Sequence, residues 1–517
     1  MGSFYVENFG CRATQADGAA IEEQLRHRGL HRAVAPEHAE LVVLNTCTVT
    51  AAADQDARAA IRRINRENPG CRILVTGCYA QRAPEELAAL PGVTWVVGNS
   101  HKHQLVEIAA PAICNSGSRT NRASPVTDVK KNRESADSAM PGDAALSSRW
   151  EEPSSVSERS APGFVPLSTF ESDQRELVTE NRIFVSDIFA HTELLAAPVF
   201  EAANERTRPN LKVQDGCDNR CSFCVIPYVR GQSRSLKLEE ALRQVSALVQ
   251  AGYREVVISG INLGRWGRDL VPWPEAGQSR VVGASGLGLA TGKARVFGFV
   301  DLIRAVLAGT SVEKLRISSV EPMDWTDELI HFMADSPRIA KHAHVPMQSG
   351  SDAVLRRMHR KYRPWHYREK IEKIRAAIPT AAIGADVMVG FPGETEAEFE
   401  ETRRMVEELS FTYLHVFTYS PRPGTPAAAM PNQVPIGVAR ERNHILRELA
   451  GEKKLAFMRS FIGRTVDAIT LNIFEGESTE ALTDNYLKLQ LKGRHEANRW
   501  LSARVDGVQN RALLGSL

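Results

Sequence analysis

Three cysteines near the middle of the chain have a spacing that suits metal chemistry. Cys217, Cys221 and Cys224 form a C-x3-C-x2-C loop directly after a predicted strand at residues 211–214. Closely spaced thiolates bind either zinc or an iron–sulfur cluster. Structural zinc takes four ligands, and no fourth cysteine or suitably spaced histidine lies near this loop in the sequence. Three thiolates therefore favour a cubane iron–sulfur cluster with one open iron, and zinc is the alternative.

An open iron on such a cluster has a specific use. It can chelate the amine and carboxylate of S-adenosylmethionine and deliver an electron to the sulfonium, which releases a 5′-deoxyadenosyl radical. The loop therefore predicts a radical enzyme that holds a 4Fe–4S cluster and uses S-adenosylmethionine. An iron–sulfur or RNA-binding protein without radical turnover is the alternative from another functional class.

A second set of cysteines lies in the first hundred residues. Cys11, Cys47 and Cys78 each follow the carboxyl end of a predicted strand, at residues 4–6, 41–44 and 72–75. Predicted helices at residues 16–28, 51–65 and near Pro84 alternate with these strands, which is typical of a parallel, doubly wound sheet. The carboxyl ends of parallel strands share one edge, so the three thiols are expected to meet there. Three buried structural cysteines are the alternative.

The rest of the chain divides into segments of different composition. Polar residues without an apolar period fill 112 to about 175 and predict a disordered insertion, while 181–205 regain some apolar character. From 209 the strand–helix rhythm resumes with six expected strands, which predicts a partial (β/α)6 barrel with its chemistry at the strand ends. These strands are expected at 211–214, 255–259, 314–318, 342–346, 382–389 and 412–417.

The expected domains follow from these divisions. Short strand-like pieces after about 455 predict a small all-β domain, and a Gly-rich insertion at about 271–296 interrupts the barrel. The predicted boundaries are therefore 1–111 for the N-terminal cluster domain, 112–205 for a linker, 206–454 for the core and 455–517 for the β-domain.

Composition and net charge indicate in which compartment the protein works and how it could bind RNA. The chain has 517 residues, eight cysteines and a net charge of +2. It contains no apolar stretch of about 20 residues and no signal-peptide pattern, so we expect a cytoplasmic protein that does not enter a membrane. Cysteines in a reducing compartment favour metal or redox chemistry over disulfides. Binding to RNA would need a local positive field, for which the basic run at 356–375 is one candidate and a solvated helix face the alternative.

The cysteine loop, with Phe223 just before its last cysteine, resembles the signature of the radical S-adenosylmethionine superfamily. Together with Gly10-Cys11, Asn45-Thr46-Cys47 and Gly77-Cys78, it resembles the methylthiotransferases in particular. The resemblance covers nearly the whole chain apart from the two insertions. It implies a second 4Fe–4S cluster on the N-terminal cysteines, also with an open iron, and a small C-terminal TRAM-like domain that helps to bind RNA.

The same resemblance implies that the reaction places a methylthio group on C2 of an adenine, and it implies what the reaction requires. Two S-adenosylmethionine molecules are expected per turnover, one to supply the methyl group and one the radical. An electron donor and a sulfur source are also expected, and a monomeric enzyme.

Further segments resemble blocks of this family, namely HVPMQSGSD at 344–352, GADVMVGFPGET at 384–395 and YSPRPGTPA at 419–427. Polar and glycine residues near strand ends are expected to contact S-adenosylmethionine, although each could equally be a turn or a cap. These candidates are Gly260, Asn262, Ser319, Gln348, Ser349, Asp386 and Gly390. Gly260-Ile261-Asn262 stands where the superfamily often has Gly-Gly-Glu, so this chain departs from that pattern.

Three branches of the family compete for the substrate. They modify isopentenyladenosine in tRNA, threonylcarbamoyladenosine in tRNA, or an aspartate of a ribosomal protein. The basic residue after Cys11 and the segment around Cys47 resemble the threonylcarbamoyladenosine branch, whose substrate lies in the anticodon stem-loop. An arginine would suit the carboxylate of that base, since an Arg–carboxylate pair is directional and strong. Arg12 and Arg230 are the candidates.

Overall fold

The computed structural model describes residues 2–114, 182–191, 194, 208–270 and 298–517. Its N-terminal part is a six-stranded, entirely parallel sheet in the order β2-β1-β3-β4-β5-β6. The strands are β1 (Ser3–Asn8), β2 (His31–Arg32), β3 (Leu41–Thr46), β4 (Arg72–Gly77), β5 (Val93–Gly98) and β6 (Ile183–Phe184). The short β6 follows the long segment 115–181 in the sequence and closes one edge of this sheet.

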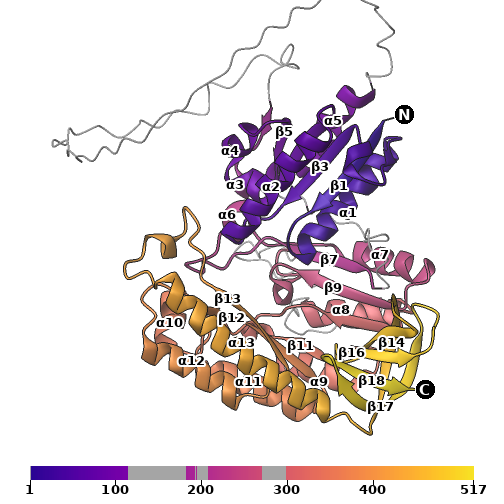
Figure 1. The fold of residues 1–517 in the computed structure, drawn as a ribbon, viewed down its shortest axis with the longest axis vertical. Helices are drawn as coiled ribbons and strands as arrows, with labels where there is room; N and C mark the ends of the chain where they lie inside the picture. The colour runs from indigo at the N-terminus through magenta and orange to yellow at the C-terminus, as the bar shows by residue number, and fades with distance from the viewer. Residues whose placement is uncertain (1, 115–181, 192–193, 195–207, 271–297) are drawn as a thin grey trace, which may run out of the picture. The chain divides into compact units, whose positions relative to one another are not determined.

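Helices cover both faces of this sheet (Figure 1). The helices are α1 (Arg12–His27), α2 (Ala51–Glu67), α3 (Cys78–Arg82), α4 (Pro84–Ala88) and α5 (Leu105–Cys114). Apolar residues of α1 and α5 pack on one face, with Ile21 and Leu105 among them, while α2 to α4 pack on the other through Ile61, Tyr79 and Leu87. Alternating strand residues such as Val42 and Val43 supply the two cores, as expected from the two-residue period of a strand.

The central part has two sheets. One has the order β10-β9-β7-β8 and the other β11-β12-β13. Isolated parallel bridges, Leu315 with Ile339 and Ser319 with His344, join the end of the first sheet to the start of the second. The strands are β7 (Asn210–Asp215), β8 (Arg234–Ser235), β9 (Glu255–Gly260), β10 (Lys314–Ile317), β11 (His342–His344), β12 (Ala382–Val389) and β13 (Tyr413–Thr418).

Helices surround these strands and bury one continuous apolar core. They are α6 (Ile226–Arg230), α7 (Leu238–Gln250), α8 (Phe299–Gly309), α9 (Asp327–Asp335), α10 (Asp352–Arg357), α11 (Pro364–Ala377), α12 (Glu396–Glu408) and α13 (Ile436–Arg459). Side chains on the opposite faces of the strands, such as Lys212, Arg316 and His344, are polar although they are buried. Buried polar side chains at this density are typical of a binding site rather than of a plain core.

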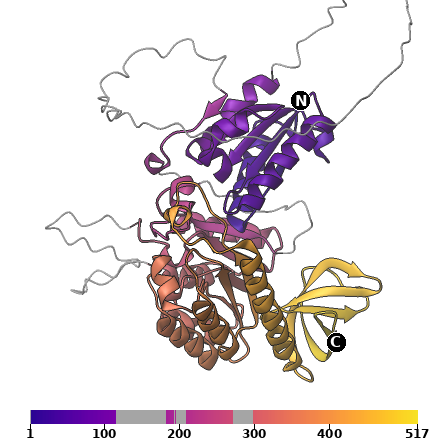
Figure 2. The ribbon, with the colours of Figure 1, turned by 60° about the vertical axis from the view of Figure 1, so that its left-hand side comes forward.

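The C-terminal part is a small closed β-barrel in the order β14-β15-β16-β18-β17, drawn in yellow in Figure 2. Its strands are β14 (Thr465–Glu475), β15 (Ser478–Thr483), β16 (Lys488–Lys492), β17 (Trp500–Gln509) and β18 (Ala512–Ser516). The barrel has its own apolar core, which includes Leu489 and Val505 together with Met458 from the end of α13. Most of its strand pairs are antiparallel.

The fold follows the predicted order of elements with several differences. All six strands expected in the central part are present, but α1 begins at Arg12 rather than at residue 16, and α13 runs through the expected boundary at 455. The strand-like pieces expected at 465–471, 486–491 and 501–505 are β14, β16 and β17. The strands that were not predicted are β2, β5, β6, β8, β15 and β18, because strands this short show no clear period. The expected insertions at 112–175 and 271–296 lie largely or wholly outside the described residues. Within the described ranges, no helix is both long and apolar enough to cross a membrane.

Candidate active site with two sets of three cysteines

The three N-terminal cysteines lie at one edge of the parallel sheet. Cys11 caps the start of α1, Cys47 directly follows β3, and Cys78 is the first residue of α3 after β4. The register pairs Asn8 with Asn45 and Thr46 with Gly77, so the three strands end side by side. This is the convergence that the strand–cysteine pattern predicts.

Contacts around Cys47 show how close the three thiols are. Gly10 has φ +104°, and a Cβ atom at that position would lie 2.6 Å from the Cβ of Cys47. Burial, together with the neighbouring Cys78 and Cys11, raises the pKa of the Cys47 thiol to about 12. Cys71 precedes the opposite end of β4, about 20 Å away by strand length. Three thiols, with no fourth beside them among the cysteine side chains that the structure describes, fit a cluster with one open iron.

The second cysteine loop is held by backbone contacts. The Cys217 N–H donates to the carbonyl of Gly231 at 3.0 Å, and the Cys224 N–H donates to the carbonyl of Cys221 at 3.1 Å. Between them, the Ser222 hydroxyl donates to the carbonyl of Arg357 at 2.8 Å. These bonds shape the loop through its own backbone and leave the three thiols available as ligands.

Gly216 makes the turn into this loop possible. Its φ is +70°, and an added Cβ would lie 1.8 Å from the carbonyl oxygen of Gln232. We expect a Gly216→Ala protein to lose the iron bound at this loop and to be less stable by about 2–4 kcal/mol, because both the φ angle and the contact are unfavourable. Iron content and thermal unfolding check this result. Gly252→Ala is the control, since Gly252 has φ +91° with nothing within 4 Å. An equal loss there would mean that the close contact is unimportant.

Polar side chains surround the loop. Arg360 Nη1 lies 3.2 Å from Cys221 Sγ, and the same guanidinium pairs with Glu321. Asn262 Nδ2 lies 3.6 Å from Cys217 Sγ. A cavity of about 10 Å³, large enough for about one water molecule, borders Cys221, Arg360 and Glu321. N–H donors beside thiolate sulfurs stabilise their negative charge, which is also how a protein tunes an iron–sulfur cluster.

Burial affects the thiols of this loop as well. It raises the pKa of Cys217 and raises that of Cys224 to about 12, and the nearby Cys221 acts in the same direction. Neutral thiols must lose their protons when iron binds, so assembly of a cluster here releases protons. The donor set therefore fits a cluster on three thiolates.

The two cysteine sets lie next to each other. Cys78 packs against Val225 and Val229, and Val225 is the residue after Cys224. Asn99 bridges the same contact, because its Nδ2 donates to the carbonyl of Val229 at 2.7 Å and lies 3.6 Å from Cys78 Sγ. The element that follows the second cysteine loop therefore packs beside Cys78 of the first set.

The predicted cofactor contacts fall into different environments. Gly260 ends β9, and the Asn262 N–H donates to Gln214 Oε1 at 2.6 Å. Asn262 Oδ1 is buried and has no hydrogen-bond partner among the described residues. Together with its approach to Cys217, this makes Asn262 the best placed of the predicted cofactor contacts.

Ser319 and Gln348 follow β10 and β11, and Asp386 lies within the neighbouring β12. Ser319 Oγ is 2.9 Å from Nδ1 of His344, and both His344 and His415 approach Asp386 Oδ1, at 3.3 and 3.2 Å. Burial would raise the pKa of Asp386, but the two histidines outweigh it and lower the pKa well below its usual value. The ligand atoms of Asp386 and the two histidines lie within 4.8 Å of one another, and His415 is hydrogen-bonded to the carboxylate. Gln348 has φ +63° and a buried Oε1 without a partner in the described part of the chain.

Ser349 and Gly390 are engaged in packing. Ser349 Oγ is 3.1 Å from the hydroxyl of Thr402 and accepts the N–H of Ser351. A Cβ at Gly390 would lie 2.6 Å from Cβ of Ala439 on α13. Ser349 therefore stabilises the start of α10, and Gly390 allows α13 to approach the end of β12 closely.

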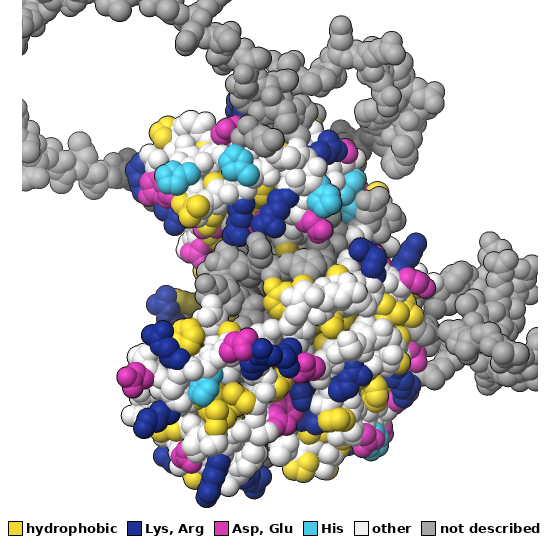
Figure 3. Space-filling model, turned by 90° about the vertical axis from the view of Figure 1, so that its right-hand side faces the viewer, with side chains coloured by type: hydrophobic (Ala, Val, Ile, Leu, Met, Phe, Trp, Pro, Cys, Tyr) yellow, Lys and Arg dark blue, Asp and Glu magenta, His cyan; other side chains and the backbone are white. Residues whose placement is uncertain are grey.

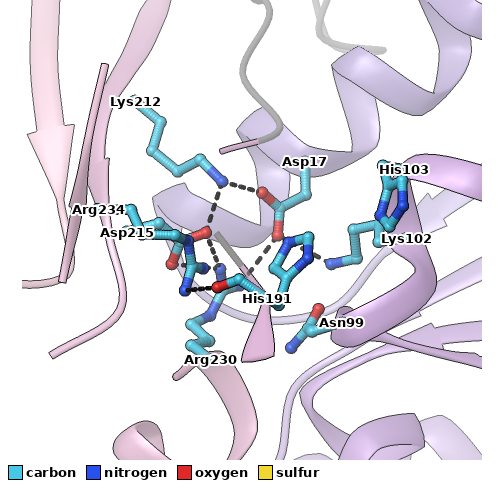
Figure 4. Close-up of a pocket in the computed structure, with 9 residues that line it drawn as sticks. All are labelled: Asp17, Asn99, Lys102, His103, His191, Lys212, Asp215, Arg230 and Arg234. Carbon is cyan, nitrogen blue, oxygen red and sulfur yellow. Dashed lines mark hydrogen bonds and ion pairs between the residues drawn. The ribbon is translucent and has the colours of Figure 1, made fainter. Parts of the chain in front are cut away.

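The two predicted substrate arginines have very different surroundings. Arg230 is 2% exposed and pairs with Asp17 at 3.0 Å and with Asp215 at 2.9 Å, as Figure 4 shows. Arg12 is half-buried beside Cys11, and its Nη2 lies 3.4 Å from the hydroxyl of Tyr486 in the C-terminal barrel. Among the described residues no carboxylate pairs with Arg12. The charge of Arg230 is therefore neutralised within the protein, whereas that of Arg12 has no acidic partner in the described ranges.

The basic run at 356–375 is largely neutralised by acidic residues. The arginines at 356, 357, 360, 363 and 368 and Lys373 all form ion pairs. Figure 3 draws one face of the molecule, on which Lys and Arg side chains are interspersed among acidic ones. The run therefore presents less free positive charge than its composition indicates.

Several residues of the site were missed by the sequence analysis. Arg360 belongs to the basic run at 356–375, yet nothing in the spacing links it to Cys221. Asp17 and Asp54, which are buried beside basic side chains, were missed as well. Each is an acidic residue on the inward-packing side of a helix, and this signal in the sequence could have shown that they are buried. It could not have shown which cations they pair with.

Comparison with known proteins agrees with this geometry. Residues 3–98 match the uncharacterized protein family UPF0004 and residues 211–406 match the radical SAM superfamily. The chain is 32% identical to the threonylcarbamoyladenosine tRNA methylthiotransferase MtaB of Bacillus subtilis (strain 168), over 96% of this chain and 92% of that protein. The protein of the same description from Aquifex aeolicus (strain VF5) is 30% identical, over 95% and 97%.

Other relatives differ in their substrate. The tRNA-2-methylthio-N(6)-dimethylallyladenosine synthase of Erythrobacter litoralis (strain HTCC2594) is 30% identical over 90% of this chain and 86% of its own. Among solved structures, the radical S-adenosylmethionine methyltransferase TsrM of Kitasatospora setae aligns with a TM-score of 0.47 and 14% identity, over 82% of this chain and 76% of its own. From the two domain matches and the full-length relatives, the chain belongs to the radical S-adenosylmethionine methylthiotransferase family and is an enzyme.

Proposed function

We propose that the enzyme places a methylthio group on C2 of N6-threonylcarbamoyladenosine, next to the anticodon of tRNA. The observation that carries the proposal is the packing of Cys78 against Val225, which sets two three-cysteine sites side by side. Radical formation and sulfur insertion need two such sites within reach of one substrate atom. Full-length similarity to proteins named for threonylcarbamoyladenosine supports the choice of base.

Each cysteine set would hold one 4Fe–4S cluster. When bound, the clusters supply the electron that cleaves S-adenosylmethionine and an open iron for sulfur. Cys217, Cys221 and Cys224 hold the first and orient it through the loop, while Arg360 and Asn262 place N–H donors beside its thiolates. The N-terminal trio holds the second. An electron donor and a sulfur source complete the requirements of the reaction, which uses two S-adenosylmethionine molecules.

The remaining parts have roles that their shapes support. The two central sheets, joined by the bridges near Ile339 and His344, form one open (β/α)6 barrel whose strand ends face the cysteines. The closed C-terminal barrel is a TRAM-like domain that contacts the anticodon stem-loop. A domain that begins at the end of α13, rather than at 455, suits the packing of Met458 in its core. The N-terminal domain then comprises 1–111 together with β6, and the radical core extends from 206 to about 459.

Arg12 is the residue that we assign to the carboxylate of the threonylcarbamoyl group. It follows Cys11 directly, is partly exposed, and has no acidic partner in the described part of the chain. The hydroxyl of Tyr486, from the C-terminal domain, lies beside it at 3.4 Å. Arg230 instead serves the structure, because both of its ion pairs lie inside the protein.

Nucleoside mass spectrometry tests the function. In tRNA from a strain that lacks this gene, 2-methylthio-N6-threonylcarbamoyladenosine is expected to disappear, with the unmethylthiolated base accumulating and the isopentenyl derivative intact. Reintroducing the gene should restore it. Loss of the 2-methylthio isopentenyl derivative instead would assign the enzyme to that substrate. If neither base changes and the methylthio group is instead lost from the ribosomal-protein aspartate, the enzyme acts on that protein.

A further inference from the structure

Two buried carboxylates connect the N-terminal domain to the radical core, and each lies a short way after a cluster cysteine. Asp17 is on α1, six residues after Cys11, and Asp54 is on α2, seven residues after Cys47. Both are almost fully buried, at 1% and 4% exposure. An unpaired buried carboxylate is strongly unfavourable, so the partners of these two residues decide how the domains can pack.

Asp17 has cationic partners in both domains. Within its own domain Lys102 pairs with it at 3.0 Å, while from the core Arg230 pairs at 3.0 Å and Lys212 also reaches it. Figure 4 shows Lys212 and Lys102 approaching this carboxylate from opposite sides. Burial alone would raise the pKa of Asp17, but the three cations lower it to about 2. The carboxylate is therefore charged and shared.

Asp54 repeats the arrangement at the next cysteine. Arg82 of its own domain pairs with it at 2.9 Å, and Arg422 from the core pairs with the same oxygen. Thr48, which directly follows Cys47, donates to Asp54 at 2.6 Å and accepts from both arginines. Arg422 is 3% exposed and belongs to the YSPRPGTPA block.

We infer that these two ion-pair junctions, centred on Asp17 and Asp54, are positioning devices that hold the auxiliary cluster in place against the radical site. The inference rests on the proposed two-cluster function. Each junction links a helix that begins just after a cysteine of the N-terminal set to a core element through a buried ion pair. Transfer of sulfur to a substrate radical depends on sub-ångström placement, so the junctions govern the fate of the radical rather than its formation.

The inference is tested by substituting the arginines of the core that pair with Asp54 and Asp17. Arg422→Gln removes the contact between domains but leaves Asp54 paired with Arg82, so the N-terminal domain keeps its charge balance and can still fold. The reconstituted variant is expected to keep both clusters and to form 5′-deoxyadenosine within about threefold of the wild-type rate, while methylthiolated product per 5′-deoxyadenosine falls at least about tenfold. Arg422→Lys should restore part of this ratio.

A magnetic measurement separates positioning from general damage. In the fully reduced wild type, two neighbouring clusters should broaden each other's electron paramagnetic resonance spectrum, and this broadening should weaken in Arg422→Gln. Arg442→Gln is the matched control, because it breaks an equally buried pair with Glu394 at 2.9 Å that lies within the core. It should leave the broadening and the product ratio unchanged.

The outcomes are distinguishable. Unchanged broadening and product ratio in Arg422→Gln would overturn the inference, and so would an equal effect of Arg442→Gln. If Arg422→Gln fails to bind iron, Arg230→Gln at the other junction is measured in the same way, with Asp17 still paired to Lys102. Failure of both to load the auxiliary cluster would also overturn it, because the junctions would then be needed for folding. A wild type that makes no methylthio product would refute the proposed function, while the broadening would still test the junctions.

Discussion

A Cys221→Ala protein is expected to form no detectable 5′-deoxyadenosine, whereas a Cys47→Ala protein still forms it but transfers no methylthio group. Each variant should retain about half of the wild-type iron after anaerobic reconstitution, because each removes one ligand of one cluster. Without three thiolates the radical site loses its cluster and cannot cleave S-adenosylmethionine. Without Cys47 the radical site is intact, and only the sulfur-bearing site is lost.

The measurement is mass spectrometry of 5′-deoxyadenosine and of the modified nucleoside in the same reaction, alongside iron analysis. Cys71→Ala is the control, because it removes a half-buried thiol that lies near neither cysteine set. It should keep its iron and both products. Methylthio product from Cys47→Ala, or loss of 5′-deoxyadenosine from it, would contradict the division of roles between the two sets.

An Arg12→Ala protein is expected to act about 10- to 150-fold less efficiently on a threonylcarbamoyladenosine stem-loop. This corresponds to the about 1.5–3 kcal/mol that a hydrogen bond to a charged group contributes. Its guanidinium has no acidic partner among the described residues, so the whole of its charge can meet the substrate carboxylate. Steady-state kcat/KM for methylthiolation checks this, and Arg12→Lys should lose less, since it keeps the charge without the paired donors.

A substrate change isolates the contact. A stem-loop with the carboxylate converted to a methyl ester should be poor for the wild type and no poorer for Arg12→Ala, as expected when both changes remove the same interaction. Arg62→Ala, which alters an exposed arginine on α2, should discriminate acid from ester as the wild type does. If Arg12→Ala still prefers the acid to the ester by the wild-type factor, another group binds the carboxylate.

Much of the fold could be predicted from local pattern. Strands and helices have characteristic periods, so residues 255–259 and 382–389 were expected as strands and are β9 and β12. The start of α1 was placed too late, because Cys11 is not a typical capping residue and the structure shows no side-chain cap bond there. The hairpin strands β15 and β18 escaped prediction, since they pack in a small barrel whose register depends on all its strands.

The candidate site divides in the same way. The two cysteine sets were predictable, because one is a contiguous motif and the other occupies equivalent strand ends. The partners of Cys221 and Asp54 were not, since Arg360 is 139 residues from the first and Arg422 is 368 residues from the second. Arg230 was predicted as a substrate contact from its charge alone. In the structure it is buried and pairs with Asp17, which is 213 residues away, so the sequence did not reveal this partner.

The sequence by itself determined the chemistry of the ligands, the order of the elements and the family. These depend on residue type and on spacing within one element, which a single chain displays directly. Only the tertiary structure decided that the two cysteine sets are neighbours, since Cys78 lies in one apolar cluster with Val225. It also decided which charged side chains pair across the two domains. Such contacts arise when whole elements pack to bury their apolar faces, so they depend on every layer of the fold at once.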